Sequence, residues 1–411
     1  MASNFSKPVE QALEYIYYDM RSGHGQEALR LLEQASAAGD GDASCVLARC
    51  LCGDQYVWSG HGFPEDDERA TRLMQLGVEQ GSAAAVLLCL RSGALTPSLE
   101  QKMPFDSLKA AFEDVLEKAR AGEHFCEYMV GNVYFWWDFT KIDGKGPDSF
   151  PDFPAFQAYL KENIAKCEDW LWKAYRGGIF FAGNNLNKLY QDGDEDLIPP
   201  RPEKARGIWR TGAEMGYPPH QKWYADELLE AGDTAGALNW YKQAAEGGEA
   251  GGWYGLGSMY ADGKGVPADP AYAASCWEKG AAKGSIGSMN LLGKACYYGT
   301  GVPQDYGRAV QLLGQAFDEG SDWGAFYLAS CYFNGWGAPK DYKKVLEILD
   351  KASWCNKDMY YMLGVIYGQG LGVAADIPKA VGYLQKAGDL KEAKEELLHY
   401  KKTLFGKWVR R

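Results

Sequence analysis

The sequence has no long apolar run and no feature of an export signal. No stretch approaches the roughly eighteen uninterrupted apolar residues that a membrane-spanning helix needs, so we expect no membrane span. The N-terminal MASNFSKPVEQALEYIYYDM contains neither the basic segment nor the apolar segment of a secretory signal. Together these absences predict a cytoplasmic protein.

The sequence also lacks the common motifs of catalysis and metal binding. The five histidines are His24, His61, His124, His220 and His399, and no two of them stand four residues apart. No Cys-x-x-Cys, Walker or Gly-x-Ser-x-Gly motif occurs. The acidic stretch 192–196 resembles the start of a calcium loop, but Leu197 stands where that loop needs glycine, so we interpret it as a solvated loop. The sequence therefore predicts no catalytic residue, no metal site, no cofactor and no enzymatic activity.

The net charge indicates which partners are favoured, and the spacing of the cysteines indicates their redox state. The 43 Lys and Arg residues against 55 Asp and Glu residues give a net charge of −12. Such a chain repels phosphate backbones, which disfavours nucleic acid, and it attracts basic partners over long distances. The ten cysteines show no paired spacing, which favours reduced core thiols over a disulfide scaffold.

Glycine is abundant, with 50 residues, and its spacing is regular in the C-terminal half. A Gly-x-Gly loop is followed each time by an aspartate, and these aspartates stand 36, 36 and 35 residues apart. The four loops are Gly263–Gly265 with Asp269, Gly299–Gly301 with Asp305, Gly335–Gly337 with Asp341, and Gly370–Gly372 with Asp376. A repeat of this length predicts a solenoid.

Each repeat contains the elements of a helix hairpin. In the first unit, Leu256 and Tyr260 lie four residues apart on one helical face, and Gly257 leaves room for a partner helix. The glycine loop supplies residues that accept positive φ, and Asp269 is placed to cap the second helix. The sequence thus predicts an all-α fold built from antiparallel helix pairs.

This pattern resembles the Sel1-like repeat, a relative of the tetratricopeptide repeat. The resemblance implies an α-α superhelix (solenoid), and it implies the role of an adaptor that binds other proteins, most often in bacteria. We expect four regular repeats over 250–388 and degenerate repeats over 1–249, with an insertion near 134–160. Residues 389–411 are expected to form a capping helix and a basic tail that docks Leu404, Phe405 and Trp408 on the last repeat. About nine or ten units are expected in all.

The concave face of such a solenoid is the expected binding surface for a protein or peptide. Related repeats present residues two before the repeat leucine, and then four and seven positions further on, to the groove. The candidate partner-binding residues are Tyr254, Ser258, Asn290, Lys294, Tyr297, Phe326, Phe333 and Tyr361. Aromatic side chains with a few polar groups are typical of recognition surfaces, although the first of these positions can also be half-buried between helices.

The insertion supplies a second aromatic candidate surface, consisting of Phe135, Trp136, Trp137 and Phe153. Its prolines predict an extended segment. Two alternatives stay open: the insertion shapes the groove, or its phenylalanines fold back on Trp136 and Trp137.

The main functional hypothesis is a non-enzymatic protein-binding scaffold. An alternative is a regulatory or neutralising partner of a toxin or effector. A distant alternative is a β-lactam-binding or hydrolysing enzyme, but the relatives linked to that activity carry paired cysteines in each repeat, which this sequence lacks.

Overall fold

The computed structural model describes residues 5–18, 24–53, 56–194, 197–404 and 406–411. Within these residues the chain is helical apart from loops, an isolated bridge between Asp194 and Ile198, and one C-terminal β-hairpin. The chain divides into two compact units, which are described separately. Unit 1 contains residues 1–227 and 246–248, and unit 2 contains residues 228–245 and 249–411.

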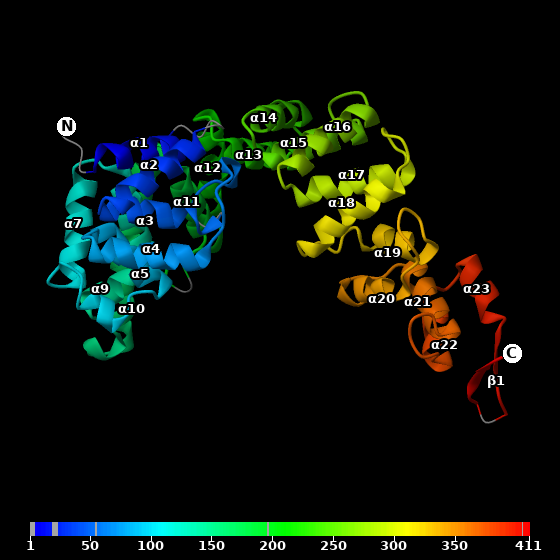
Figure 1. Cartoon of the computed structure of the whole chain (residues 1–411). Coiled ribbons are helices and arrows are strands. Elements are labelled where there is room, and N and C mark those ends of the chain that lie inside the picture. Colours follow the sequence, from blue (N-terminus) through cyan, green and yellow to red (C-terminus); the bar gives the residue numbers. More distant parts are fainter. Residues whose placement is uncertain (1–4, 19–23, 54–55, 195–196, 405) are drawn as a thin grey trace. The chain divides into compact units, whose positions relative to one another are not determined.

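Unit 1 is built from helix hairpins (Figure 1). Its first pairs are α1 (Lys7–Leu13) continued by a π-helical turn (Glu14–Tyr18) with α2 (Gly25–Ala37), and α3 (Gly41–Cys50) with α4 (Asp67–Glu79). Next come α5 (Ala83–Ser92) with α7 (Leu108–Arg120), α8 (His124–Phe135) with α10 (Phe153–Arg176), and α11 (Phe180–Asp192) with α12 (Pro202–Glu214). Short helices α6 (Pro97–Glu100) and α9 (Asp138–Asp143), and 3-10 turns at Ser59–His61 and Pro147–Ser149, lie in the connections. Helix α13 (Pro218–Glu230) contains the boundary between the units.

Unit 2 repeats the same hairpin. Helix α14 (Thr234–Glu246) is followed by the pairs α15 (Ala250–Asp262) with α16 (Pro270–Ala282), α17 (Ile286–Tyr298) with α18 (Tyr306–Asp318), α19 (Ala325–Asn334) with α20 (Tyr342–Lys351), and α21 (Lys357–Gln369) with α22 (Ile377–Lys386). Helix α23 (Lys391–Leu397) and strands β1 (Tyr400–Lys402) and β2 (Trp408–Arg410) complete the chain.

In each unit, first helices of successive pairs contact one another. In unit 1, α3 contacts α5, α5 contacts α8, and α8 contacts α11. In unit 2, α15 contacts α17, and α19 contacts α21. Among the described residues, second helices of successive pairs make no comparable contact. The first helices therefore join successive pairs, while their position on a concave binding face stays a prediction.

The repeat residues fulfil the roles predicted for them. The repeat leucines are buried, with Leu256 3% and Leu292 1% exposed, and each contributes roughly 1.5–3 kcal/mol of burial free energy. The small residue after the leucine is required by the second helix, because a Cβ on Gly257 would stand 2.5 Å from Nε1 of Trp277. Asp269 caps α16 by accepting a hydrogen bond from the amide of Tyr272 at 2.9 Å.

The two glycines of each loop have different tasks. Gly299, with φ of 73°, ends α17 in the left-handed conformation. Gly301 also has positive φ, 74°, and a Cβ there would stand 2.1 Å from the carbonyl oxygen of Pro270. The second glycine therefore lets each loop pack against the start of the second helix of the preceding pair, so it helps set the spacing between repeats.

The prediction of one helix over 389–411 is wrong beyond Leu397. The chain turns into an antiparallel hairpin that pairs Tyr400 with Arg410 and Lys402 with Trp408. Tyr400 and Trp408 pack against the last repeat, whereas Leu404 at the hairpin tip is fully exposed. Phe405 lies outside the described residues. Across the hairpin, the Nζ of Lys402 lies 5.3 Å from the centre of the ring of its partner Trp408.

The prediction of an extended insertion is wrong for most of its length. Residues 138–143 form α9, and Pro154 stands in the first turn of α10, where a helix tolerates proline because the missing amide hydrogen has no partner there. The insertion folds back, but on different rings from those expected. Phe150 packs on Tyr159 and Phe156, at centroid distances of 5.1 and 5.5 Å. None of the described ring contacts joins Phe150, Phe153 or Phe156 to Trp136 or Trp137.

Candidate functional site

A cavity of about 460 Å³ opens between the first helices α15 and α17 of unit 2. Tyr254 and Ser258 of α15 line one side, and Lys294 and Tyr298 of α17 line the other. Tyr254 is 39% and Tyr298 is 54% exposed, which is unusual for large aromatic side chains. Three predicted groove residues, Tyr254, Ser258 and Lys294, therefore lie together around a real depression.

The aromatic surface continues from this cavity onto α19. Tyr298 meets Tyr327 edge to face at a centroid distance of 5.7 Å, and Tyr327 lies 6.2 Å from Trp323. The ammonium group of Lys294 lies 5.9 Å from the centre of the Trp323 ring. We name the set Tyr254, Lys294, Tyr298, Trp323 and Tyr327 the aromatic groove. It combines accessible rings with one cation, which is a composition suited to peptide recognition.

Two predicted groove residues are buried and serve packing instead. Asn290 is 5% exposed, and its side-chain amide donates to the hydroxyl of Ser321 at 2.8 Å. Tyr297 is 8% exposed and contacts the rings of Tyr306 and Trp336 at 5.4 and 6.0 Å. Burial raises the pKa of Tyr297 to about 12, which keeps the phenol neutral. The open face of the helix is rotated slightly from the predicted one, so Tyr298 occupies the place expected for Tyr297.

The remaining predicted groove residues are half-buried. Phe326 packs on Tyr327 at a centroid distance of 5.1 Å. Phe333 lies 6.3 Å from Tyr361, and the two rings join α19 to α21. The carboxylates of α23, Glu396 foremost, lie close enough to Tyr361 to add to the effect of burial, and both raise the pKa of its phenol. These three aromatics link neighbouring repeats and offer only part of their surface.

The second aromatic candidate set is divided between two places in unit 1. Phe135 and Trp136 pack against each other at 4.9 Å, and Trp136 is 48% exposed. Trp137 has φ of 62°, a conformation costly for any residue except glycine, and its Nε1 donates to Asp194 at 2.9 Å. Phe153 is 61% exposed but contacts Phe156 at the start of α10, away from these rings.

The described residues contain no group of three or more His, Cys, Asp or Glu side chains arranged to hold a metal ion. Within the acidic stretch 192–196, Asp194 accepts the Trp137 hydrogen bond, while Glu195 and Asp196 lie outside the described residues. No helix in the described part of the chain is both long and apolar enough to cross a membrane.

A family comparison identifies the repeat. The model described as "Sel1 repeat" matches seven segments, which together cover slightly more than half of the chain. The segments are 25–40, 46–82, 228–249, 254–285, 286–321, 324–353 and 357–391. The chain belongs to the Sel1 repeat family. The unmatched residues 83–227 nevertheless form Sel1-like helix hairpins, so the architecture extends beyond the sequence signature.

Solved structures agree with a Sel1-repeat fold. The crystal structure of c5321, a protective antigen present in uropathogenic Escherichia coli strains displaying an SLR fold, has a TM-score of 0.53 and 22% identity, and the match covers 94% of this chain and 78% of that one. A Sel1 repeat protein from Oxalobacter formigenes matches at a TM-score of 0.46 with 20% identity over 97% of this chain and 94% of that one. The immunity protein Pa5087 from Pseudomonas aeruginosa matches at 0.33 with 19% identity over 45% of this chain and 72% of that one.

At 22% identity the E. coli likeness bears on the fold alone, and TM-scores below 0.5 support no conclusion. No curated protein matches the chain significantly. The Sel1 repeat explains the helix pairs and their stacking, while the groove residues belong to this chain.

Proposed function

We propose that this Sel1-repeat protein is a non-enzymatic scaffold that binds a segment of a partner protein along the aromatic groove of unit 2. The observation that carries the proposal is the cavity between α15 and α17, where Tyr254 and Tyr298 keep large exposed areas. The exposed parts of these two tyrosine rings contribute no burial free energy to the folded protein. A partner that covers them would gain this free energy on binding. Lys294 between them supplies a donor that orients the bound segment.

The polar groups of the cavity support binding rather than catalysis. The hydroxyl of Ser258 donates to the carbonyl oxygen of Tyr254 at 2.9 Å, so it forms part of the helix. Asp262 pairs with Lys264 at 2.9 Å. No histidine is among the described residues that line the cavity, and its carboxylate, Asp262, is held by Lys264.

The test is an affinity capture from a lysate of the native cell with the purified protein as bait. The bait is compared with the double variant Tyr254→Ala/Tyr298→Ala, which empties the groove of two anchors. Trp354→Ala is the matched control, because Trp354 is also exposed, at 42%, but lies in the loop between α20 and α21. Circular dichroism shows whether all three proteins are folded.

We expect the wild type and the control to capture the same protein and the double variant to capture about tenfold less, since two aromatic anchors of an interface contribute more than 1.4 kcal/mol. Equal capture by all three baits would remove the groove from consideration. A single captured toxin or effector would favour the regulatory or neutralising role over a general scaffold.

A further inference from the structure

One position of the first helix carries a cation in several repeats. Lys294 is the ninth residue after Ser285, the N-cap of α17. In unit 1 the same position, counted from the N-caps Asp40, Ser82 and Ile179, is occupied by Arg49 in α3, Arg91 in α5 and Lys188 in α11. In α8, whose N-cap is Glu123, it is Asn132. The first helices of unit 1 thus carry a row of cations in a chain of net charge −12.

Two of these cations flank the exposed ring of Trp136. The guanidinium carbon of Arg91 lies 5.8 Å from the ring centre, and the Nζ of Lys188 lies 5.5 Å from it. Lys188 is exposed and has no carboxylate partner among the described ion pairs. Cation, ring and cation therefore form one accessible surface from three helices. We name Arg91, Lys188 and Trp136 the basic face.

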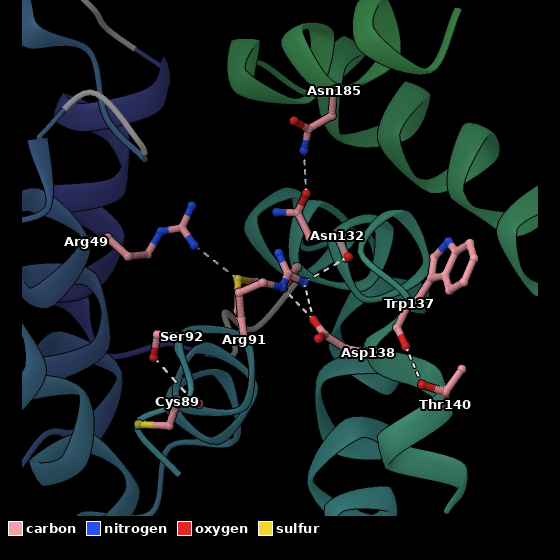
Figure 2. A network of polar contacts seen from close by, with 10 residues as sticks. Arg49, Cys89, Arg91, Ser92, Asn132, Trp137, Asp138, Thr140 and Asn185 are labelled. Atoms are coloured by element: carbon pink, nitrogen blue, oxygen red, sulfur yellow. Dashed lines mark hydrogen bonds and ion pairs between the residues drawn. The ribbon is translucent and has the colours of Figure 1, made fainter. Parts of the chain in front are cut away.

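The network beneath Trp136 holds this surface in place. Arg91 donates to Asp138 at 2.5 Å and to the backbone oxygen of Asn132 at 2.8 Å. Asn185 donates to the side-chain oxygen of Asn132 at 2.6 Å. In Figure 2, Asn132 lies between Arg91 and Asn185 and connects α5 with α11 through α8. Side chains fixed in this way lose little further entropy when a partner binds.

Arg49 adds a buried positive charge behind the basic face. It is 1% exposed, and among the described residues no carboxylate pairs with it. Its Nε donates to the hydroxyl of Tyr17 at 3.1 Å, its Nη1 contacts the sulfur of Met129 at 3.4 Å, and its Nη2 has no hydrogen-bond partner. The guanidinium lies against the rings of Tyr56, Phe125 and Tyr128 at 4.6–5.3 Å. An arginine side chain keeps its positive charge even when it is buried. Because the protein interior screens charges less than water does, the electric field of Arg49 extends to the basic face.

Of these three cations, only Arg91 has a carboxylate partner among the described ion pairs. Asp138 is committed to Arg91, so Lys188 and Arg49 are left without a carboxylate among the described residues. A buried charge without a counter-ion is destabilised, and a nearby anion compensates part of that cost. The expectation of a basic partner, which came from the net charge, does not describe this face, because net charge averages over surfaces of opposite sign.

We propose that the basic face binds an acidic segment of a partner protein, with partner carboxylates on Lys188 and Arg91 and an apolar partner side chain on Trp136. The inference rests on the proposed scaffold function and adds a second binding surface, in unit 1, with the chemistry of the segment that it binds. A peptide fits better than a nucleic acid, because a short peptide contacts only the basic face, whereas a longer polyanion also meets the acidic remainder of the protein.

The experiment measures fluorescence anisotropy of a short labelled peptide of alternating Glu and Leu. The same peptide with Lys in place of Glu and a labelled single-stranded oligothymidylate are compared with it. The variant is Lys188→Glu, an exposed position on α11. The matched control is Lys173→Glu on the second helix α10, where an exposed lysine also lies over a tryptophan ring, 4.2 Å from the centre of Trp170. Thermal unfolding of both variants checks the fold.

We expect the Glu-Leu peptide to bind the wild type and the control alike, to weaken about tenfold or more with Lys188→Glu, and to dissociate as salt is added. The Lys-Leu peptide should not bind. The proposal is overturned if the Glu-Leu peptide does not bind the wild type, if both lysine variants behave alike, or if the oligothymidylate binds more tightly than the peptide.

The capture experiment distinguishes failure of the acidic-segment proposal from failure of the proposed scaffold function. If Tyr254→Ala/Tyr298→Ala loses its captured protein while the peptide test fails, the scaffold stands and the acidic-segment inference falls. If neither the groove variant nor Lys188→Glu changes capture or peptide binding, both fall.

Discussion

His220 makes the stability of unit 1 depend on pH in a way that can be measured. It is fully buried on α13, and its ring is surrounded by those of Phe180, Trp209, Tyr217 and Trp223 at centroid distances of 4.9–5.7 Å. Burial lowers the pKa of His220 from 6.5 to about 3, because the imidazolium cannot keep its hydration. The folded protein therefore holds this residue neutral throughout the usual working range.

The hydrogen-bond partners of His220 carry no charge. Its Nδ1 lies 3.0 Å from the hydroxyl of Tyr175, which donates to the carbonyl oxygen of Ile208 at 2.7 Å, and its Nε2 lies 3.3 Å from the Oδ1 of Asn184. Only glycine fits at position 212 beside the ring, because a Cβ there would stand 1.8 Å from Nδ1 of His220. No carboxylate is among the causes of the pKa shift, so nothing compensates the charged form.

The direction of the pH dependence follows from the protonation of His220 in the folded and in the unfolded state. Above the unfolded-state pKa of 6.5, both states hold neutral His220 and the residue contributes no pH dependence. Below pH 6.5 the unfolded chain binds a proton on His220, whereas the folded chain does so only near its own pKa of about 3. The free energy of unfolding therefore falls as the pH is lowered from 6.5 to about 3. At about pH 5 the loss from this residue is about 2 kcal/mol relative to about pH 8.

The assay is urea unfolding at the two pH values, followed by the fluorescence of tryptophans that include Trp209 and Trp223. His220→Gln should lose about 2 kcal/mol less than the wild type on acidification. The control His399→Gln, at an exposed position, should lose as much as the wild type. Burial also lowers the pKa of His61, but His61 is present in every protein compared and cancels in the difference. Equal losses in His220→Gln and the wild type would refute the reasoning.

Three further predictions concern packing and chemistry. Gly301→Ala should lower the free energy of unfolding by about 3 kcal/mol or more, because its Cβ would overlap the Pro270 carbonyl. The control Gly284→Ala, at a position with φ of 83° and open space, should lower it by only about 1 kcal/mol in the same urea titration. Equal losses in the two variants would contradict the close approach of Gly301 to Pro270. Arg49→Met should leave the melting temperature unchanged or raise it, because it removes an uncompensated buried charge. The same variant should bind the Glu-Leu peptide more weakly. A large drop in melting temperature would contradict the interpretation of Arg49 as an uncompensated charge. A thiol reagent should titrate all ten cysteines after unfolding and few before, because all ten are free and most are buried; fewer than ten would indicate disulfides.

The regular repeats could be predicted from the sequence because their information is local. A glycine at each helix end, an aspartate at each N-cap and a leucine followed by a small residue each specify a short stretch of backbone. The middle of the chain, 83–227, lacks most of these signals, yet it folds into the same hairpins because each first helix still presents an apolar face to its neighbours.

The candidate site was predicted only in part, for a geometric reason. A small rotation of the first helix exchanges Tyr298 for Tyr297 at the open face, and the hydrogen bond to Ser321 draws Asn290 inside. Neither effect can be read from a helical period. The shared position of Arg49, Arg91 and Lys188 could have been found by counting from the N-caps, but the irregular loops between them hide that register.

The sequence by itself determined the helix hairpin, its caps and the 36-residue spacing, because these depend on contacts between residues close along the chain. Tertiary structure decided which rings stay exposed, how the C-terminal residues pair as strands, and that cations from two separate helices share one face with Trp136. These features depend on side chains that lie tens of residues apart, whose meeting is fixed by how successive helix pairs stack.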